Sequence, residues 1–166
     1  MKTFVFIDAS NLFYGGQKSL GWKVDYQKLF RYLKEKYNAE NVFYFGGVEI
    51  HDFPYNYQFS ETVPIGDLEK HLLALLKNTR LNEAEVVLVG RHLQRVRFYL
   101  KLKQFGYNLF LKPVKMYEKE DGTTKRKANC DVDMAFHLMK EKDNFQRVVA
   151  LSGDGDFLPA FKYLKS

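Results

Sequence analysis

A nearly continuous apolar run at the start of the chain constrains the fold more than any other feature. Residues 2–8 (KTFVFID) are rich in Phe, Val and Ile and have almost no polar alternation. A strand that is apolar on both faces is typical of the centre of a parallel sheet, which helices cover on both sides. Parallel strands also need long crossover connections, which are usually helices. The run therefore predicts an α/β fold.

The rest of the chain alternates in the way that this fold requires. Further strands are expected at 41–50, 108–117 and 147–152, and helices at 25–37, 67–78, 93–104, 130–141 and 156–165. Residues 85–89 fit either a short strand or a continuation of the helical layer. Asp25 is expected to cap the first helix and Gly106 to end the third. Gly46-Gly47 marks a place where the 41–50 strand can break, and residues 120–122 (EDG) predict a hairpin tip.

This order of elements predicts a single domain, residues 1–166, with a three-layer α/β/α sandwich around a mainly parallel sheet. We expect the sheet to lack its last edge strand, because the sequence stops at Ser166 directly after a predicted helix.

Composition excludes several classes of protein. A hydrophobic fraction of 46% and a charged fraction of 28% are typical of a globular chain. The single cysteine, Cys130, excludes an internal disulfide framework and a cysteine-rich zinc module. No apolar run approaches the roughly 20 residues that span a bilayer, and the first residues do not resemble a signal peptide. We therefore expect a cytoplasmic protein without a membrane partner.

Positive charge is concentrated in one segment. Residues 91–127 hold 11 Lys and Arg against 3 acids, a local charge of +8, whereas the other 129 residues sum to −2. A local basic excess favours polyanionic partners such as nucleic acid. The alternative is a solvated surface that is rich in lysine.

Several acidic residues directly follow a predicted strand or begin a predicted helix, which places them at one edge of the expected sheet. Ligands of parallel sheets bind at the carboxyl ends of the strands. Asp8 ends the first strand, the last strand leads into Ser152, Asp154 and Asp156 (SGDGD), and the helix at 130–141 opens with Asp131 and Asp133. Clustered carboxylates repel one another unless they take up protons or bind a cation.

An all-oxygen ligand set favours Mg²⁺ or Mn²⁺, and such ions activate water for phosphodiester hydrolysis. Each acid also has a purely structural interpretation. Asp131 can be a helix cap, Asp154 and Asp156 can be turn formers, and Asp8 can be an ordinary loop acid. Asn11 fits a water-holding or phosphate-binding residue as well as a capping residue.

Three segments resemble a known family. They are FIDASNLFYG (6–15), KANCDVDMAFHLM (127–139) and ALSGDGDFLPAFKYL (150–164). In this order they are similar to the NYN domain family, also called LabA-like, a branch of the PIN-like nuclease superfamily. The resemblance implies a ribonuclease that depends on Mg²⁺ or Mn²⁺. By position it implies that Asp8, Asp131, Asp154 and Asp156 are the metal-site and catalytic acids, with Asn11 and Ser152 in support.

The match has one departure. Many relatives carry a second acid about six residues after the Asp131 position, where this chain has His137. Asp133 is an additional acid, but a helix turns ~100° per residue, so Asp131 and Asp133 should point in different directions. We expect His137 to be a half-buried helical residue rather than a metal ligand.

Basic and aromatic residues complete the prediction. Arg91 and Arg95 on the helix and the loop residues Lys125, Arg126 and Lys127 are candidate RNA-binding cations beside the acids. The alternatives are a solvated helix face and a loop tip. Within the aromatic stretch 43–59, the first three rings are expected to alternate on a strand and fill the core. The later four can stack on unpaired bases, although packing or a homodimer contact is the favoured interpretation; they are Phe53, Tyr55, Tyr57 and Phe59.

The resulting prediction is a metal-dependent ribonuclease that acts on single-stranded or loop RNA. The first alternative is a non-catalytic RNA-binding or regulatory module, which the His137 departure supports. A phosphatase with Asp8 as nucleophile is less favoured, because position 10 is Ser rather than a second Asp. A Rossmann cofactor site is not expected, because no GxGxxG follows the first strand.

Overall fold

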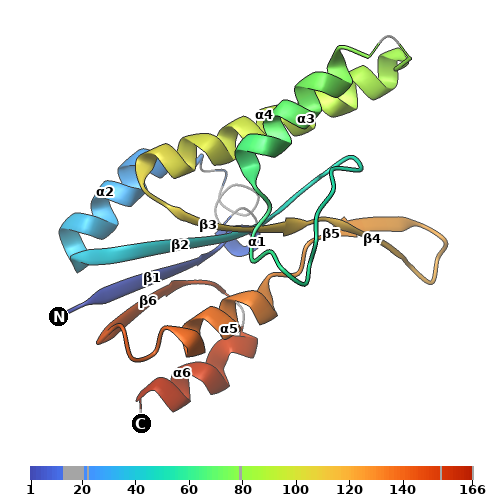
Figure 1. Cartoon of the computed structure of the whole chain (residues 1–166). Helices are drawn as coiled ribbons and strands as arrows, with labels where there is room; N and C mark the ends of the chain where they lie inside the picture. The colour runs from blue at the N-terminus through green and yellow to red at the C-terminus, as the bar shows by residue number, and fades with distance from the viewer. Residues whose placement is uncertain (13–20, 22, 79, 154, 166) are drawn as a thin grey trace.

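The chain folds around a four-stranded parallel sheet (Figure 1). The computed structural model describes residues 1–12, 21, 23–78, 80–153 and 155–165. The strand order is β3-β2-β1-β6, with bounds β1 Thr3–Asp8, β2 Ala39–Val48, β3 Asn108–Pro113 and β6 Arg147–Leu151. All six residues of β1 are buried, as the apolar run predicts for a central strand. The α/β class and the parallel sheet are therefore confirmed.

Helices cover both faces of the sheet. Helices α2 (Tyr26–Tyr37), α3 (Ile65–Leu76) and α4 (Glu83–Phe105) lie on one face, and α5 (Asp131–Lys140) and α6 (Leu158–Lys165) lie on the other (Figure 1). Successive residues of a strand point to opposite faces. Val5 and Ile7 of β1 accordingly join the core under α2 to α4, and Phe4 and Phe6 join the core that includes Met134 of α5. The three-layer arrangement follows directly from this alternation.

The helix ends agree with the predicted caps. The Asp25 side chain accepts a hydrogen bond from the backbone N–H of Lys28 at 3.0 Å, which caps α2. Gly106, with φ of 112°, ends α4. The strand interpretation of 85–89 is wrong, because these residues belong to α4, which starts ten residues earlier than expected. None of the helices in the described ranges, α4 included, has the length and apolarity to cross a membrane.

Two strand predictions need correction. The 41–50 strand does not break at Gly46-Gly47, since β2 continues to Val48. The strand predicted at 108–117 is two strands, β3 and β4 (Lys115–Glu118). β4 pairs antiparallel with β5 (Thr124–Lys127), and the predicted turn is the tip of this projecting hairpin (Figure 1).

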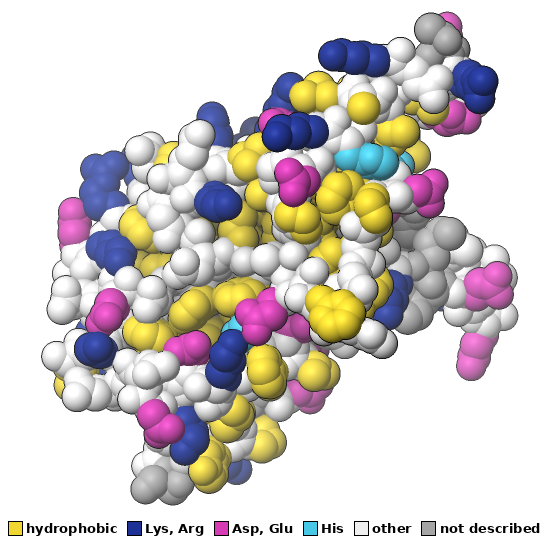
Figure 2. Space-filling view, in the orientation of Figure 1, with side chains coloured by type: hydrophobic (Ala, Val, Ile, Leu, Met, Phe, Trp, Pro, Cys, Tyr) yellow, Lys and Arg dark blue, Asp and Glu magenta, His cyan; other side chains and the backbone are white. Residues whose placement is uncertain are grey.

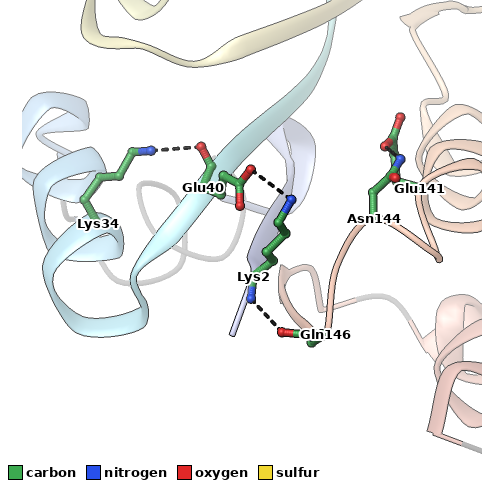
Figure 3. A network of polar contacts seen from close by, with 6 residues as sticks. All are labelled: Lys2, Lys34, Glu40, Glu141, Asn144 and Gln146. Carbon is green, nitrogen blue, oxygen red and sulfur yellow. Dashed lines mark hydrogen bonds and ion pairs between the residues drawn. The ribbon is translucent and has the colours of Figure 1, made fainter.

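Polar contacts join the elements at the amino ends of the strands. The Lys34 ammonium donates to the backbone carbonyl of Glu40 at 2.9 Å, and the Lys2 ammonium lies 3.8 Å from a Glu40 carboxylate oxygen (Figure 3). The backbone N–H of Lys2 donates to the side-chain carbonyl of Gln146 at 3.0 Å. These contacts link β1, β2 and the start of β6, so this edge is structural. The opposite edge, where the strands end, holds the acids.

Candidate functional site

Asp8 ends the central strand at the carboxyl edge of the sheet. Its side chain is buried, with 4% of the residue surface exposed. One of its oxygens, Oδ1, accepts a hydrogen bond from the backbone N–H of Ser10 at 3.1 Å, at the start of the short helix α1 (Ala9–Leu12). Ile7 pairs with Leu151 across the sheet, so Ser152 leaves β6 beside the strand end that carries Asp8. The register therefore brings these two predicted positions together.

The second group of acids begins helix α5. Cys130, not Asp131, occupies the N-cap position, and the backbone N–H of Asp131 donates to the side-chain oxygen of Asn129 at 3.0 Å. The interpretation of Asp131 as only a helix cap is therefore wrong. Asp131 is in the first turn of α5, where the positive end of the helix dipole stabilises a carboxylate.

Cys130, at the N-cap of α5, is a buried thiol with charged groups around it. Burial raises the pKa of its thiol to about 12. The positive charge of Lys112 lowers this pKa, whereas the negative charges of Asp133, Asp8 and Asp131 raise it further. Cys130 and Met134 pack in one hydrophobic core with Phe6 of β1, so α5 begins beside the central strand.

Asp133 points toward β3. The Lys112 ammonium donates to an Asp133 carboxylate oxygen at 2.8 Å, which forms an ion pair across the sheet edge. The negative charge of Asp133 is thus offset locally by Lys112.

A glycine in β2 allows the segment before α5 to approach the sheet. A Cβ added at Gly47 would lie 2.4 Å from the Cβ of Ala128, and one added at Gly46 would lie 2.8 Å from the Tyr99 hydroxyl. That hydroxyl donates to the backbone carbonyl of Gly47 at 2.7 Å. The Gly46-Gly47 pair, interpreted from the sequence as a strand break, instead admits close neighbours on each face.

His137 belongs to the core under α5. It is 5% exposed, and its ring centroid lies 3.9 Å from that of Phe110 and 5.5 Å from that of Phe45. Burial lowers the pKa of His137, which favours the neutral imidazole. The position therefore serves packing, as expected, and is more deeply buried than the sequence suggests.

The remaining candidate residues are only partly described. Asp156 is exposed in the 3₁₀ helix η2 (Gly155–Phe157), whereas Asp154 lies outside the described residues. The backbone of Asn11 is in α1, but its side chain is outside the description. The same holds for the side chains of β5, namely Lys125, Arg126 and Lys127.

The two predicted arginines lie on α4. Arg91 is exposed on α4. The Arg95 guanidinium carbon lies 5.1 Å from the centroids of both the Phe98 and the Tyr99 rings. Neither arginine has a contact with the acids among the described residues.

The chemistry of the acids fits a hard divalent cation, because carboxylate oxygens are the ligands that such ions prefer. Within the described residues, which leave out Asp154, no three His, Cys, Asp or Glu side chains are arranged to hold a metal ion.

Comparisons with known proteins give a family and a fold. A family model described as NYN domain matches residues 60–166, well over half of the chain. This range contains the segments 127–139 and 150–164 that carry the resemblance, and it excludes the segment 6–15. No curated protein matches the sequence.

One of three similar solved structures supports the fold. A Vibrio parahaemolyticus protein of unknown function superposes with a TM-score of 0.58 at 15% identity, over 99% of this chain and 74% of that one. The T5 D15 protein co-crystallised with metal ions gives 0.46 at 16% identity, over 93% of this chain and 49% of that one. T5 5′-exonuclease with bound zinc gives 0.48 at 16% identity, over 93% of this chain and 50% of that one. The last two similarities are too weak to support a conclusion.

Proposed function

Because the chain belongs to the NYN domain family, which supports a nuclease-type function, we propose that it is a Mg²⁺- or Mn²⁺-dependent ribonuclease that cuts single-stranded or loop RNA. The observation that carries this proposal is that Asp8 ends the central strand β1 while Asp131 begins α5, the helix that packs against the same strand. Carboxylates from distant parts of the chain gather at the sheet edge where parallel folds bind ligands.

The proposed roles follow from the position of each residue. Asp8 and Asp131, together with Asp154 and Asp156, would hold the cation through carboxylate oxygens. When bound, such a cation supplies positive charge to the phosphate and lowers the pKa of a coordinated water. Asp8 is held in place by the N–H of Ser10, and Asp131 by the first turn of α5. In this proposal Asn11, Ser152 and Asp133 support the acids.

Phosphate binding is assigned to the basic residues. Arg91, Arg95, Lys125, Arg126 and Lys127 would attract the RNA backbone, which the acids alone would repel. The +8 charge of residues 91–127 supports this part of the proposal. RNA binding should therefore weaken as the salt concentration rises.

A cleavage assay tests the proposal. Labelled linear and circular RNA are incubated with the purified chain and Mg²⁺ or Mn²⁺, with and without a chelator. Cutting that depends on the metal is expected, and cutting of the circle would identify an endonuclease. A clean preparation that leaves both RNAs intact with either metal would contradict the catalytic proposal.

Variants of the proposed ligands distinguish cleavage by this chain from cleavage by a contaminating nuclease. Asp131→Asn removes the charge of a proposed ligand at an intermediate-exposure position and should abolish cutting while the fold is retained. Asp154→Asn should do the same. Asp143→Asn is a matched control, because its side chain is 86% exposed and lies beside Lys142, outside the site. Retained cutting by Asp131→Asn and Asp154→Asn would show that another enzyme produces the signal.

A non-catalytic RNA-binding or regulatory module is the second candidate. The buried, aromatic surroundings of His137 favour it, because this position carries an acid in many relatives that the sequence resembles. Retention of RNA without cleavage, by the wild-type chain with each metal, is the result that distinguishes this candidate.

A further inference from the structure

A pocket of about 260 Å³ lies beside the candidate metal centre. Tyr55 and Tyr57, from the segment after β2, and Phe136 of α5 line it. Lys112, Lys115 and Asp133 also line it. Asp133 lies in the first turn of α5 together with Asp131, so the pocket is close to the start of this helix.

Aromatic rings are available to a ligand in this pocket. Tyr57 is 58% exposed and Phe136 is 56% exposed, although both are large and apolar. Tyr55 is less exposed, and its hydroxyl donates to the backbone carbonyl of Ser60 at 3.0 Å. The Tyr57 ring meets Tyr55 edge-on, with 4.9 Å between centroids. Tyr55 thus fixes the loop, while Tyr57 presents its ring to solvent.

Exposure divides the later aromatic residues into two groups. Phe53 and Tyr55 pack against the core, as the packing interpretation expects. Tyr57 and Phe59 do not, since they are 58% and 84% exposed. Figure 2 shows hydrophobic side chains at the surface beside charged ones in the region of α5.

Two ion pairs lie around the pocket, and Lys115 takes part in neither of them. Asp133 is paired with Lys112 at 2.8 Å, and Glu61 is paired with Lys140 at 3.2 Å. The Lys115 ammonium lies 5.4 Å from the centroid of the Tyr57 ring. Lys115 forms no ion pair with an acid among the described residues, so its charge is available to an anion.

The size of the pocket limits the ligand. Sites for drug-sized molecules have volumes of about 300–1,000 Å³, so this pocket suits a single ring system rather than a helix or a duplex. A flat aromatic wall beside a lysine is the combination that single-stranded nucleic acids use, with bases stacked on rings and phosphates held by cations. A peptide segment would not need this pairing of flat rings with a phosphate-binding charge.

We propose that this pocket binds one unpaired base of the RNA, stacked on Tyr57 and Phe136, with Lys115 on an adjoining phosphate. The proposal rests on the ribonuclease function, because it makes the pocket the substrate subsite next to the acids. It would make the enzyme select single-stranded over base-paired RNA, since a base in a duplex cannot enter.

Binding measured with a chelator tests the pocket without cleavage. A short single-stranded RNA that contains 2-aminopurine is titrated with the full chain, and both anisotropy and 2-aminopurine fluorescence are recorded. Tyr57→Ala and Phe136→Ala should each weaken binding by about ten-fold, the scale of one lost stacking contact, and reduce the fluorescence change. Tyr57→Trp should restore both signals. The same RNA in a duplex should bind more weakly to the wild-type chain.

Tyr32→Ala is a matched control. Tyr32 is also exposed, at 47%, and carries the Lys36 ammonium 5.1 Å from its ring centroid, but it lies on α2. Its loss should leave RNA binding unchanged. Thermal unfolding of each variant separates a binding defect from a folding defect.

The outcomes judge the pocket and the nuclease separately. If the chain cuts RNA but Tyr57→Ala and Phe136→Ala bind it like the wild type, the pocket proposal is overturned and the nuclease remains. If both variants lose RNA binding but the wild-type chain cuts no RNA with either metal, the pocket proposal is supported and the ribonuclease proposal is overturned. A wild-type chain that binds no RNA overturns the pocket. So does a homodimer that Tyr57→Ala dissociates without any change in RNA binding.

Discussion

Replacing Gly47 by Ala tests how closely the segment before α5 approaches β2. The new Cβ would lie 2.4 Å from the Cβ of Ala128 and 3.2 Å from Cγ2 of Val114. Ordinary carbon contacts are about 3.5–4.0 Å, so the segment that contains Ala128 must move by roughly 1 Å or more. This segment leads directly into the helix that carries Asp131.

The expected loss of stability follows from two opposing effects. Overpacking of this kind costs about 1–3 kcal/mol. The substitution also removes freedom from the unfolded chain, which offsets ~0.4–1 kcal/mol, because φ at Gly47 is not in the left-handed region. The net destabilisation is about 1–2 kcal/mol, and for a chain of this size the melting temperature should fall by about 3–6 °C.

Thermal unfolding followed by circular dichroism measures this loss. Gly47→Ala combined with Ala128→Gly removes the closest contact. The double variant should therefore lose less stability than the summed losses of the two single variants. Because Asp131 moves with the displaced segment, RNA cleavage by Gly47→Ala should also fall at temperatures where the variant is folded. A single variant that melts at or above the wild-type temperature would refute the close approach of these two residues.

Three further predictions concern single side chains. In the wild type the Glu85 N–H donates to the Asn82 side-chain oxygen at 2.9 Å at the start of α4. Asn82→Ala removes this acceptor, and urea unfolding should show a free energy of unfolding lower by about 1 kcal/mol. Gly90→Ala, where nothing lies within 4 Å of the added Cβ, should raise stability by ~0.5–1 kcal/mol in the same assay. Burial lowers the pKa of His137 below its ordinary value of 6.5, so only the unfolded chain gains this proton as the pH first falls below that value. Stability should therefore decline between about pH 7 and pH 5, and His137→Leu should show a smaller decline; equal declines would contradict the role of His137.

Local sequence patterns determined most of the fold. The apolar run of β1 requires a central strand with cover on both faces, and Asp25 and Gly106 mark helix ends through backbone geometry that the residue type itself favours. The same patterns place Asp8 at a strand end and Asp131 at a helix start. These features depend on neighbours in the chain, so a single sequence contains them.

Long-range contacts decided the rest. Gly46-Gly47 resembles a strand break locally, but Tyr99 on one face and Ala128 on the other use the space that the missing side chains leave. Whether Tyr57 packs or faces solvent depended on the loop that Tyr55 anchors, and the partner of Asp133 depended on the position of β3. Such contacts join residues far apart in sequence, and their geometry is set only when the layers pack. The sequence therefore determined which residues lie at the sheet edge, and the tertiary structure decided which of their side chains meet.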